Sequence, residues 1–155
     1  MSVEERLAEA GYPLPAPAAP GGSYVPALHV GSLLYTSGQL PMVDGALPDE
    51  YKGKVGGAVS LETAREAAAR CAVNALAAVK SVVGDLERVE RVVKVVGFVA
   101  STPDFTGQPE VMNGASDLLT QAFGESGRHA RSAVGMVALP RDTCVEVELI
   151  VQVRG

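Results

Sequence analysis

The sequence contains no tryptophan, and aromatic side chains make up only 5% of its 155 residues. A surface on which nucleic-acid bases stack needs several aromatic side chains. The formal net charge of −5 at pH 7, with no basic run, also disfavours attraction to a phosphate backbone. We therefore expect no nucleic-acid partner.

Residues that hold metals or act as nucleophiles are also scarce. The chain has two cysteines, Cys71 and Cys144, far apart and in no CxxC pattern, which indicates reduced and packed thiols. Its two histidines, His29 and His129, form no cluster with cysteine or aspartate, so no metal site is expected. The absence of a GxSxG motif disfavours a serine-histidine nucleophile.

Long apolar runs are absent as well. No segment approaches the ~20 apolar residues that span a bilayer, and the first residues lack the basic-then-apolar layout of a signal peptide. We expect a cytoplasmic protein with no membrane association. A hydrophobic content of 47% in 155 residues fits one globular domain with its own core.

The N-terminal part differs from the rest of the chain. Ser2 and Glu5 have the spacing of a capping box and predict a short helix. Residues 13–20 contain four prolines and favour an extended arm. We therefore divide the chain into an N-terminal helix and proline-rich arm over 1–22 and one domain over 23–155.

The pattern of residues 23–155 predicts the order β-β-α-β-α-β-β, an α+β fold. Its expected elements are strands over 23–30 and 33–39, a helix from Ser60 to Gly84, a strand over 89–100, a helix from about Pro109 to Gly124, and two strands in the last quarter. Two amphipathic helices on one face of a mixed sheet leave its other face bare. A closed symmetric homo-oligomer would cover that face.

The last quarter predicts a hairpin whose second strand alternates strictly. One face holds Val145, Val147, Leu149, Val151 and Val153, and the other holds Glu146, Glu148, Ile150 and Gln152. If Ala138 pairs with Val145, Arg131 shares the face of the acids but lies near the other end of the hairpin. The backbones of Arg131 and Glu146 would then be roughly 20 Å apart. A site that contains both needs a second subunit.

These two residues indicate a charge-selective pocket. The planar guanidinium of Arg131 suits bidentate binding of a carboxylate. Burial at an interface would raise the pKa of Glu146 and make it a general acid or base near neutral pH. From the residues alone, a structural ion pair at an interface is the alternative. Ser37, Gly38 and Gln39 form either a plain strand end or a polar pocket wall.

Several motifs resemble one family. They are Tyr24-Val25, Tyr35-Thr-Ser-Gly-Gln-Leu-Pro41, Ala130-Arg-Ser132, Leu139-Pro140 and Val145-Glu-Val-Glu148. In content and order they resemble the Rid/YjgF family of enamine/imine deaminases, also called endoribonuclease L-PSP. The resemblance runs from about Ser23 to Val153.

The resemblance implies a chorismate mutase-like fold and a homotrimer with a central β-barrel and ligand clefts between subunits. Active members hydrolyse 2-imino acids, which equilibrate with enamines, to 2-keto acids and ammonia without a cofactor. By resemblance, Arg131 would hold the substrate carboxylate and Glu146 would activate water or shuttle a proton. The cleft would be lined by Tyr24, Ser37, Gly38 and Gln39.

One position departs from the family pattern. Ala133, which would also lie at the substrate site, stands where many of these deaminases carry cysteine, so a non-catalytic binder of small carboxylates or keto acids is an alternative. An endoribonuclease is a further alternative, and the acidic charge and lack of paired histidines count against it. The sequence does not place Asn113 inside or outside the cleft.

Overall fold

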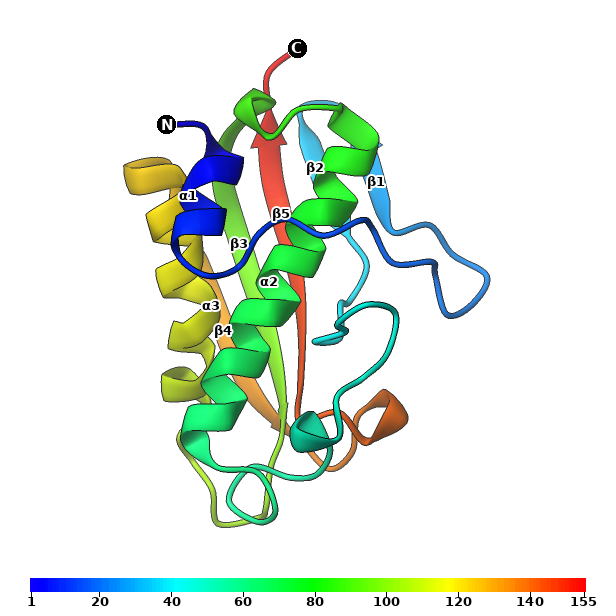
Figure 1. The fold of residues 1–155 in the computed structure, drawn as a ribbon, viewed down its shortest axis with the longest axis vertical. Coiled ribbons are helices and arrows are strands. Elements are labelled where there is room, and N and C mark those ends of the chain that lie inside the picture. The colour runs from blue at the N-terminus through cyan, green and yellow to red at the C-terminus, as the bar shows by residue number, and fades with distance from the viewer.

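The computed structural model describes all 155 residues, with three α-helices on one face of a five-stranded sheet (Figure 1). The helices are α1 (Val3–Glu9), α2 (Leu61–Val83) and α3 (Gln108–Phe123), and the strands are β1 (Ala27–Val30), β2 (Leu33–Thr36), β3 (Val89–Ala100), β4 (Ala130–Met136) and β5 (Val145–Val153). The predicted α+β class and element order are confirmed. No helix is long and apolar enough to cross a bilayer.

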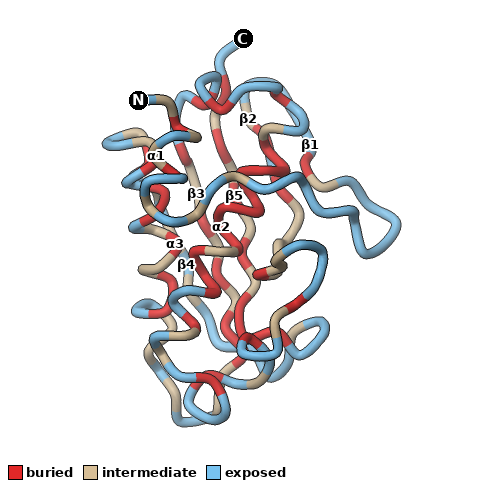
Figure 2. The backbone as a smooth tube through the Cα atoms, in the orientation of Figure 1, coloured by how far each residue is buried: buried red, intermediate tan, exposed pale blue.

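The long helix α2 begins and ends where the sequence predicts. The Ser60 hydroxyl accepts a hydrogen bond from the Thr63 N–H, and Gly84 ends the helix with φ 83°, a conformation that favours glycine. Small side chains let α2 pack closely on α3. A Cβ added at Gly114 of α3 would lie 2.1 Å from the Arg65 carbonyl oxygen of α2. The two helices therefore approach each other closely, and much of α2 is buried (Figure 2).

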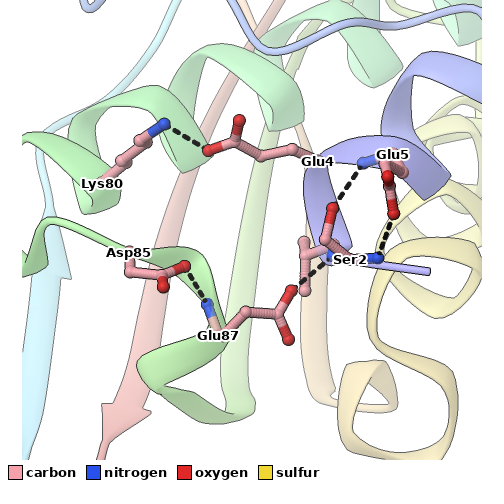
Figure 3. A network of polar contacts seen from close by, with 7 residues as sticks. Ser2, Glu4, Glu5, Lys80, Asp85 and Glu87 are labelled. Carbon is pink, nitrogen blue, oxygen red and sulfur yellow. Dashed lines mark hydrogen bonds and ion pairs between the residues drawn. The ribbon is translucent and has the colours of Figure 1, made fainter.

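The N-terminal helix α1 is joined to the same core. The capping box of Ser2 and Glu5 is present (Figure 3). Val3 and Leu7 are buried. The Val3 N–H donates to the Glu87 carboxylate at 2.6 Å, and Lys80 of α2 pairs with Glu4. These contacts hold α1 against α2 and the turn before β3.

The strand order is β1-β2-β5-β3-β4, and the predicted terminal hairpin is wrong. β4 pairs in parallel with β3, while β5 pairs antiparallel with both β3 and β2. The long strand β3 thus lies between the two strands expected to be neighbours. Alternation along a strand determines which face is buried and not which strand is its neighbour. The chain between β4 and β5 is also long enough to pass the end of one strand.

The faces of β5 are as predicted, but those of β4 are reversed. The odd-numbered residues of β5, from Val145 to Val153, are all buried, and Glu146 and Glu148 point to the other side. Arg131 pairs with Val95, which is fully buried against the helices, so Arg131 points to the helix side of the sheet. The expectation that Arg131 shares a face with Glu146 is wrong because it depended on the hairpin register.

The other face of the sheet has no helix on it (Figure 1). Its exposed apolar side chains come from β1, β2 and β4: Leu28, Val30, Tyr35, Val134 and Met136. Glu146, Glu148, Ile150 and Gln152 of β5 lie among them, half-buried. The prediction of a bare sheet face is therefore confirmed.

Candidate functional site

Two site residues predicted from the strand ends lie beside Glu146. The segment Ser37–Gln39 follows β2 and runs along β5, where the Gln39 N–H donates to the Val147 carbonyl at 2.8 Å. Gly38 faces the Glu146 side chain so closely that an added Cβ would be 1.9 Å from Oε2. A larger residue here would push the carboxylate out of its present position. The strand end is therefore fitted to Glu146.

The carboxylate of Glu146 is unpaired and only partly accessible to solvent. It is half-buried and has no hydrogen-bond or ion-pair partner within the subunit. Burial raises its pKa above the ordinary value, and the negative charge of Glu148, two residues along the same face, adds to the rise. The direction agrees with the expectation for a general acid or base.

The strand end also forms the wall of a pocket. Tyr24, Gly38, Gln39 and the proline-rich arm around Pro20 enclose a cavity of ≈ 110 Å³. The Tyr24 hydroxyl accepts a hydrogen bond from the Gly21 N–H at 3.1 Å, which holds the arm over the cavity. Tyr24 lies in a bend because the first strand begins at Ala27 and not at Ser23.

Ser37 has a local role within the subunit. Its hydroxyl donates to the Val25 carbonyl at 2.6 Å, and its N–H donates to the Pro26 carbonyl at 2.8 Å. These bonds fix the strand end against the segment that carries Tyr24. Ser37 is not among the residues that line the pocket.

Arg131 belongs to a second, separate cluster on the helix side of β4. Its Nη1 donates to Asn113 Oδ1 at 2.9 Å and to Ser116 Oγ at 3.1 Å, both on α3. These residues line a polar hollow of ≈ 290 Å³ together with Thr120, Arg128 and His129. Asn113 therefore lies with Arg131.

His129 completes the support of this arginine. Its Nδ1 lies 2.6 Å from the Gly127 carbonyl and its Nε2 lies 2.9 Å from Ser116 Oγ. A carbonyl only accepts, so Nδ1 carries the hydrogen and Nε2 accepts from the Ser116 hydroxyl. Burial lowers the pKa of His129, and the nearby Arg131 charge lowers it further, although the bond to Gly127 opposes this. The neutral ring keeps Ser116 free to accept from Arg131.

Ser116 and His129 were not predicted from the sequence. The available signal was the spacing of Asn113 and Ser116, which lie three residues apart at the polar border of an otherwise apolar helical stripe. Ala133 lies on the same face of β4 as Arg131 and packs against the hydrophobic core. A methyl group therefore occupies the strand position next to the arginine.

One subunit does not join the two clusters. Arg131 pairs with Val95 and Glu146 pairs with Phe98, so their backbones are two strands and three residues apart, about 14 Å. Their side chains also point to opposite faces of the sheet. The sequence predicted that Arg131 and Glu146 are separated along a hairpin. They are apart within one subunit, but because β3 lies between their strands and they point to opposite faces.

Gly38→Ala tests the fit between the strand end and the carboxylate. The new methyl group would displace the Glu146 side chain, which is a flexible group, so we expect a loss of about 1 kcal/mol in the free energy of unfolding. Gly57→Ala is the control, because its Cβ meets no atom closer than 3.4 Å. Thermal unfolding of both variants provides the measurement, and equal stabilities would contradict the fit.

Known proteins share this fold and much of this sequence. The structure of the protein Atu1372, of unknown function, from Agrobacterium tumefaciens superposes with a TM-score of 0.91 and 48% identity, covering 98% of this chain and 92% of that one. The structure of E. coli TdcF with bound serine superposes with a TM-score of 0.55 and 26% identity, covering 90% and 94%. The chain is also 43% identical to Protein TCP17 of Trypanosoma cruzi over 99% of this chain and 95% of that protein.

A family model described as "YjgF/chorismate_mutase-like, putative endoribonuclease" matches residues 4–153. The chain therefore belongs to the YjgF family, as the motifs predicted. Its sheet and helices have the YjgF-like fold.

Proposed function

We propose that the chain is a cofactor-independent deaminase that hydrolyses reactive 2-imino acids and their enamines to 2-keto acids and ammonia. The proposal rests on two groups with complementary chemistry, each of which would form one half of a substrate site (a half-site). Burial raises the pKa of Glu146, whose carboxylate has no partner. Hydrogen bonds to α3 fix the guanidinium of Arg131 in place. A carboxylate-bearing imine needs both a cation for its carboxylate and a group that moves protons.

The reaction site is proposed to form between subunits of a cytoplasmic homotrimer with a central β-barrel. The bare sheet face exposes Leu28, Tyr35, Val134 and Met136, and β4 is an edge strand with an unpaired backbone edge. Both features are stabilised when another chain covers them. A cyclic arrangement would bring the β4 side of one subunit to the strand-end side of the next. Arg131 of one subunit would then face Glu146 of its neighbour.

The chemistry requires orientation and proton transfer only. Arg131 binds the substrate carboxylate through its planar fork. Glu146 takes a proton from water as the water oxygen attacks C2 of the iminium group, which gives a carbinolamine. The same carboxyl group then passes the proton to nitrogen. As the C–N bond breaks, the regenerated carboxylate takes the carbinolamine O–H proton and hands it to the departing ammonia, so the products are the keto acid and an ammonium ion. No electrons are exchanged, so the reaction needs no redox cofactor.

A second candidate is a non-catalytic binder of small carboxylates or keto acids at the same cleft. Ala133 in place of the common cysteine favours it, as does TdcF, whose structure holds serine. RNA cleavage has less support. Glu146 and Glu148 lie close together on the bare face and would repel a phosphate backbone.

The test generates imines from neutral amino acids with an amino-acid oxidase and follows keto-acid release with semicarbazide as the competing trap. The proposal expects the protein to accelerate release at least tenfold over the oxidase alone, and to sediment at about three times its 16.0 kDa chain mass. Calorimetry with 2-oxobutyrate runs in parallel. Binding without any acceleration would favour the non-catalytic binder and overturn the deaminase.

A further inference from the structure

Arg141 has an unusual backbone. Arg141 (φ 57°) and Asp142 (φ 60°) are consecutive non-glycine residues in the left-handed region, which side chains with a Cβ disfavour. Two backbone hydrogen bonds tie the loop to one neighbouring segment, residues 51–53. The Gly53 N–H donates to the Asp142 carbonyl at 2.8 Å, and the Cys144 N–H donates to the Tyr51 carbonyl at 2.8 Å. Strain kept in place by its surroundings often marks a residue that serves a site.

Arg141 is also the one arginine of nine without a partner. The others donate to carbonyl oxygens (Arg6, Arg88, Arg91 and Arg154), pair with carboxylates (Arg65 and Arg128), lie over the Tyr12 ring (Arg70) or donate to Asn113 and Ser116 (Arg131). Arg141 makes no hydrogen bond or ion pair, is exposed, and is one of the residues that line the pocket of Tyr24, Gly38 and Gln39. The left-handed loop thus places an arginine without a partner at the edge of this pocket.

The pocket suits a carboxylate on a short carbon chain. No acidic side chain lines it, and Leu40, Met42 and the proline-rich arm supply apolar walls. Its volume of ≈ 110 Å³ accommodates only a small group. A single guanidinium balances the one charge of a carboxylate and matches it bidentately. A doubly charged phosphate would be left with excess negative charge beside Glu146.

Gly38 connects this pocket to the proposed reaction site. It lines the cavity and also touches the Glu146 carboxylate. Gly38 thus borders both the Glu146 carboxylate and the pocket that Arg141 lines, so this pocket adjoins the place proposed for the reacting carbon. We infer that Arg141 and the arm over residues 18–21 form a side-chain subsite that selects dicarboxylic 2-imino acids of four or five carbons. This inference rests on the proposed function for the position of the reacting carbon.

The kinetic test compares imines made by oxidases from aspartate or glutamate with imines made from alanine. Arg141→Gln keeps side-chain length and removes the charge. We expect it to lower kcat/KM for the dicarboxylic imines by 10- to 100-fold, the loss of one charged hydrogen-bonding pair, and to change the alanine imine less than threefold. Arg65→Gln, on the outer surface of α2, is the matched control and should change neither. Equal losses on both substrate types, or no loss, would overturn the subsite.

A binding experiment keeps the subsite testable without turnover. Calorimetry compares glutarate, butyrate and inorganic phosphate on wild type and Arg141→Gln. Glutarate should bind at least tenfold more tightly than butyrate, and Arg141→Gln should abolish the difference. If wild type prefers glutarate and Arg141→Gln does not, but no imine is hydrolysed, the proposed deaminase activity is wrong and the proposed carboxylate pocket is supported. If imines are hydrolysed with no preference for dicarboxylates, the subsite fails and the deaminase stands. Tighter binding of phosphate than of glutarate would also overturn the subsite.

Discussion

Glu146→Gln is expected to lower kcat for imine hydrolysis by about 10²- to 10⁴-fold, the usual contribution of a positioned general acid or base. Glutamine has nearly the same shape and keeps the contact with Gly38, but it cannot accept a proton from water. In wild type, activity should rise with pH through the Glu146 pKa, which burial and Glu148 raise above its ordinary value of 4.5. The variant should lose this rise. The keto-acid assay from pH 4 to 8 measures both effects.

Stability separates this loss of chemistry from misfolding. A carboxyl group whose pKa is raised on folding stabilises the fold fully below its unfolded pKa, and that contribution is lost as pH rises through the folded pKa. Ionised Glu146 thus disfavours the folded state at pH 7. Glu146→Gln should therefore unfold at the same temperature as wild type or higher at pH 7. Glu148→Gln is the matched control: it should stay active and shift the acid limb to lower pH. An inactive variant that also unfolds early would contradict the catalytic role.

Arg131→Ala is expected to lower kcat/KM by about 10²- to 10³-fold, since truncating one partner of a buried charged pair is costly. Arg131→Lys should recover only part of the loss, because an ammonium lacks the bidentate fork. Arg128→Ala is the control: this residue borders the same hollow but is exposed and pairs with Glu125, so less than a twofold change is expected. Initial rates over a range of imine concentrations provide the measurement. Unchanged kcat/KM in Arg131→Ala would remove the residue from the site.

Mixed oligomers test whether the two half-sites come from different chains. Arg131→Ala and Glu146→Gln are unfolded together in equal amounts and refolded. If each site takes Arg131 from one chain and Glu146 from the next, random mixing gives both native residues to about a quarter of the sites. Activity should then return to about a quarter of wild type. No recovery in a mixture that sediments as an oligomer would place both residues in one subunit's site.

Local patterns predicted most of the fold. Ser60 begins α2 through the hydrogen bond of its hydroxyl, and Gly84 ends it because glycine tolerates a positive φ. The alternation of residues from Val145 onward identified the buried face of β5. β4 offers no such separation. Arg131, Ala133 and Gly135 alternate with Ser132, Val134 and Met136, so each face contains both polar and apolar residues. Its neighbour is chosen by long-range pairing with β3, which local periodicity does not record.

The sequence likewise predicted only the part of the candidate site that local motifs determine. Tyr24, Gly38 and Gln39 were predicted together from motifs, and the structure places them around one pocket. The bonds from Arg131 to α3 depend on the packing of two distant segments, so the sequence left Asn113 unplaced. The left-handed conformation of Arg141 is imposed by contacts with the loop near Tyr51 and Gly53. Nothing in the residues around Arg141 indicates that backbone.

The sheet itself has a consequence for how such a protein diversifies. It separates Arg131 and its α3 supports, on one side, from Glu146 and Gly38 on the other. Substitutions in α3 can change the surroundings of Arg131, and the sheet separates those positions from Glu146. Under the proposed function, substitutions around Arg131 would therefore alter substrate recognition without contacting Glu146.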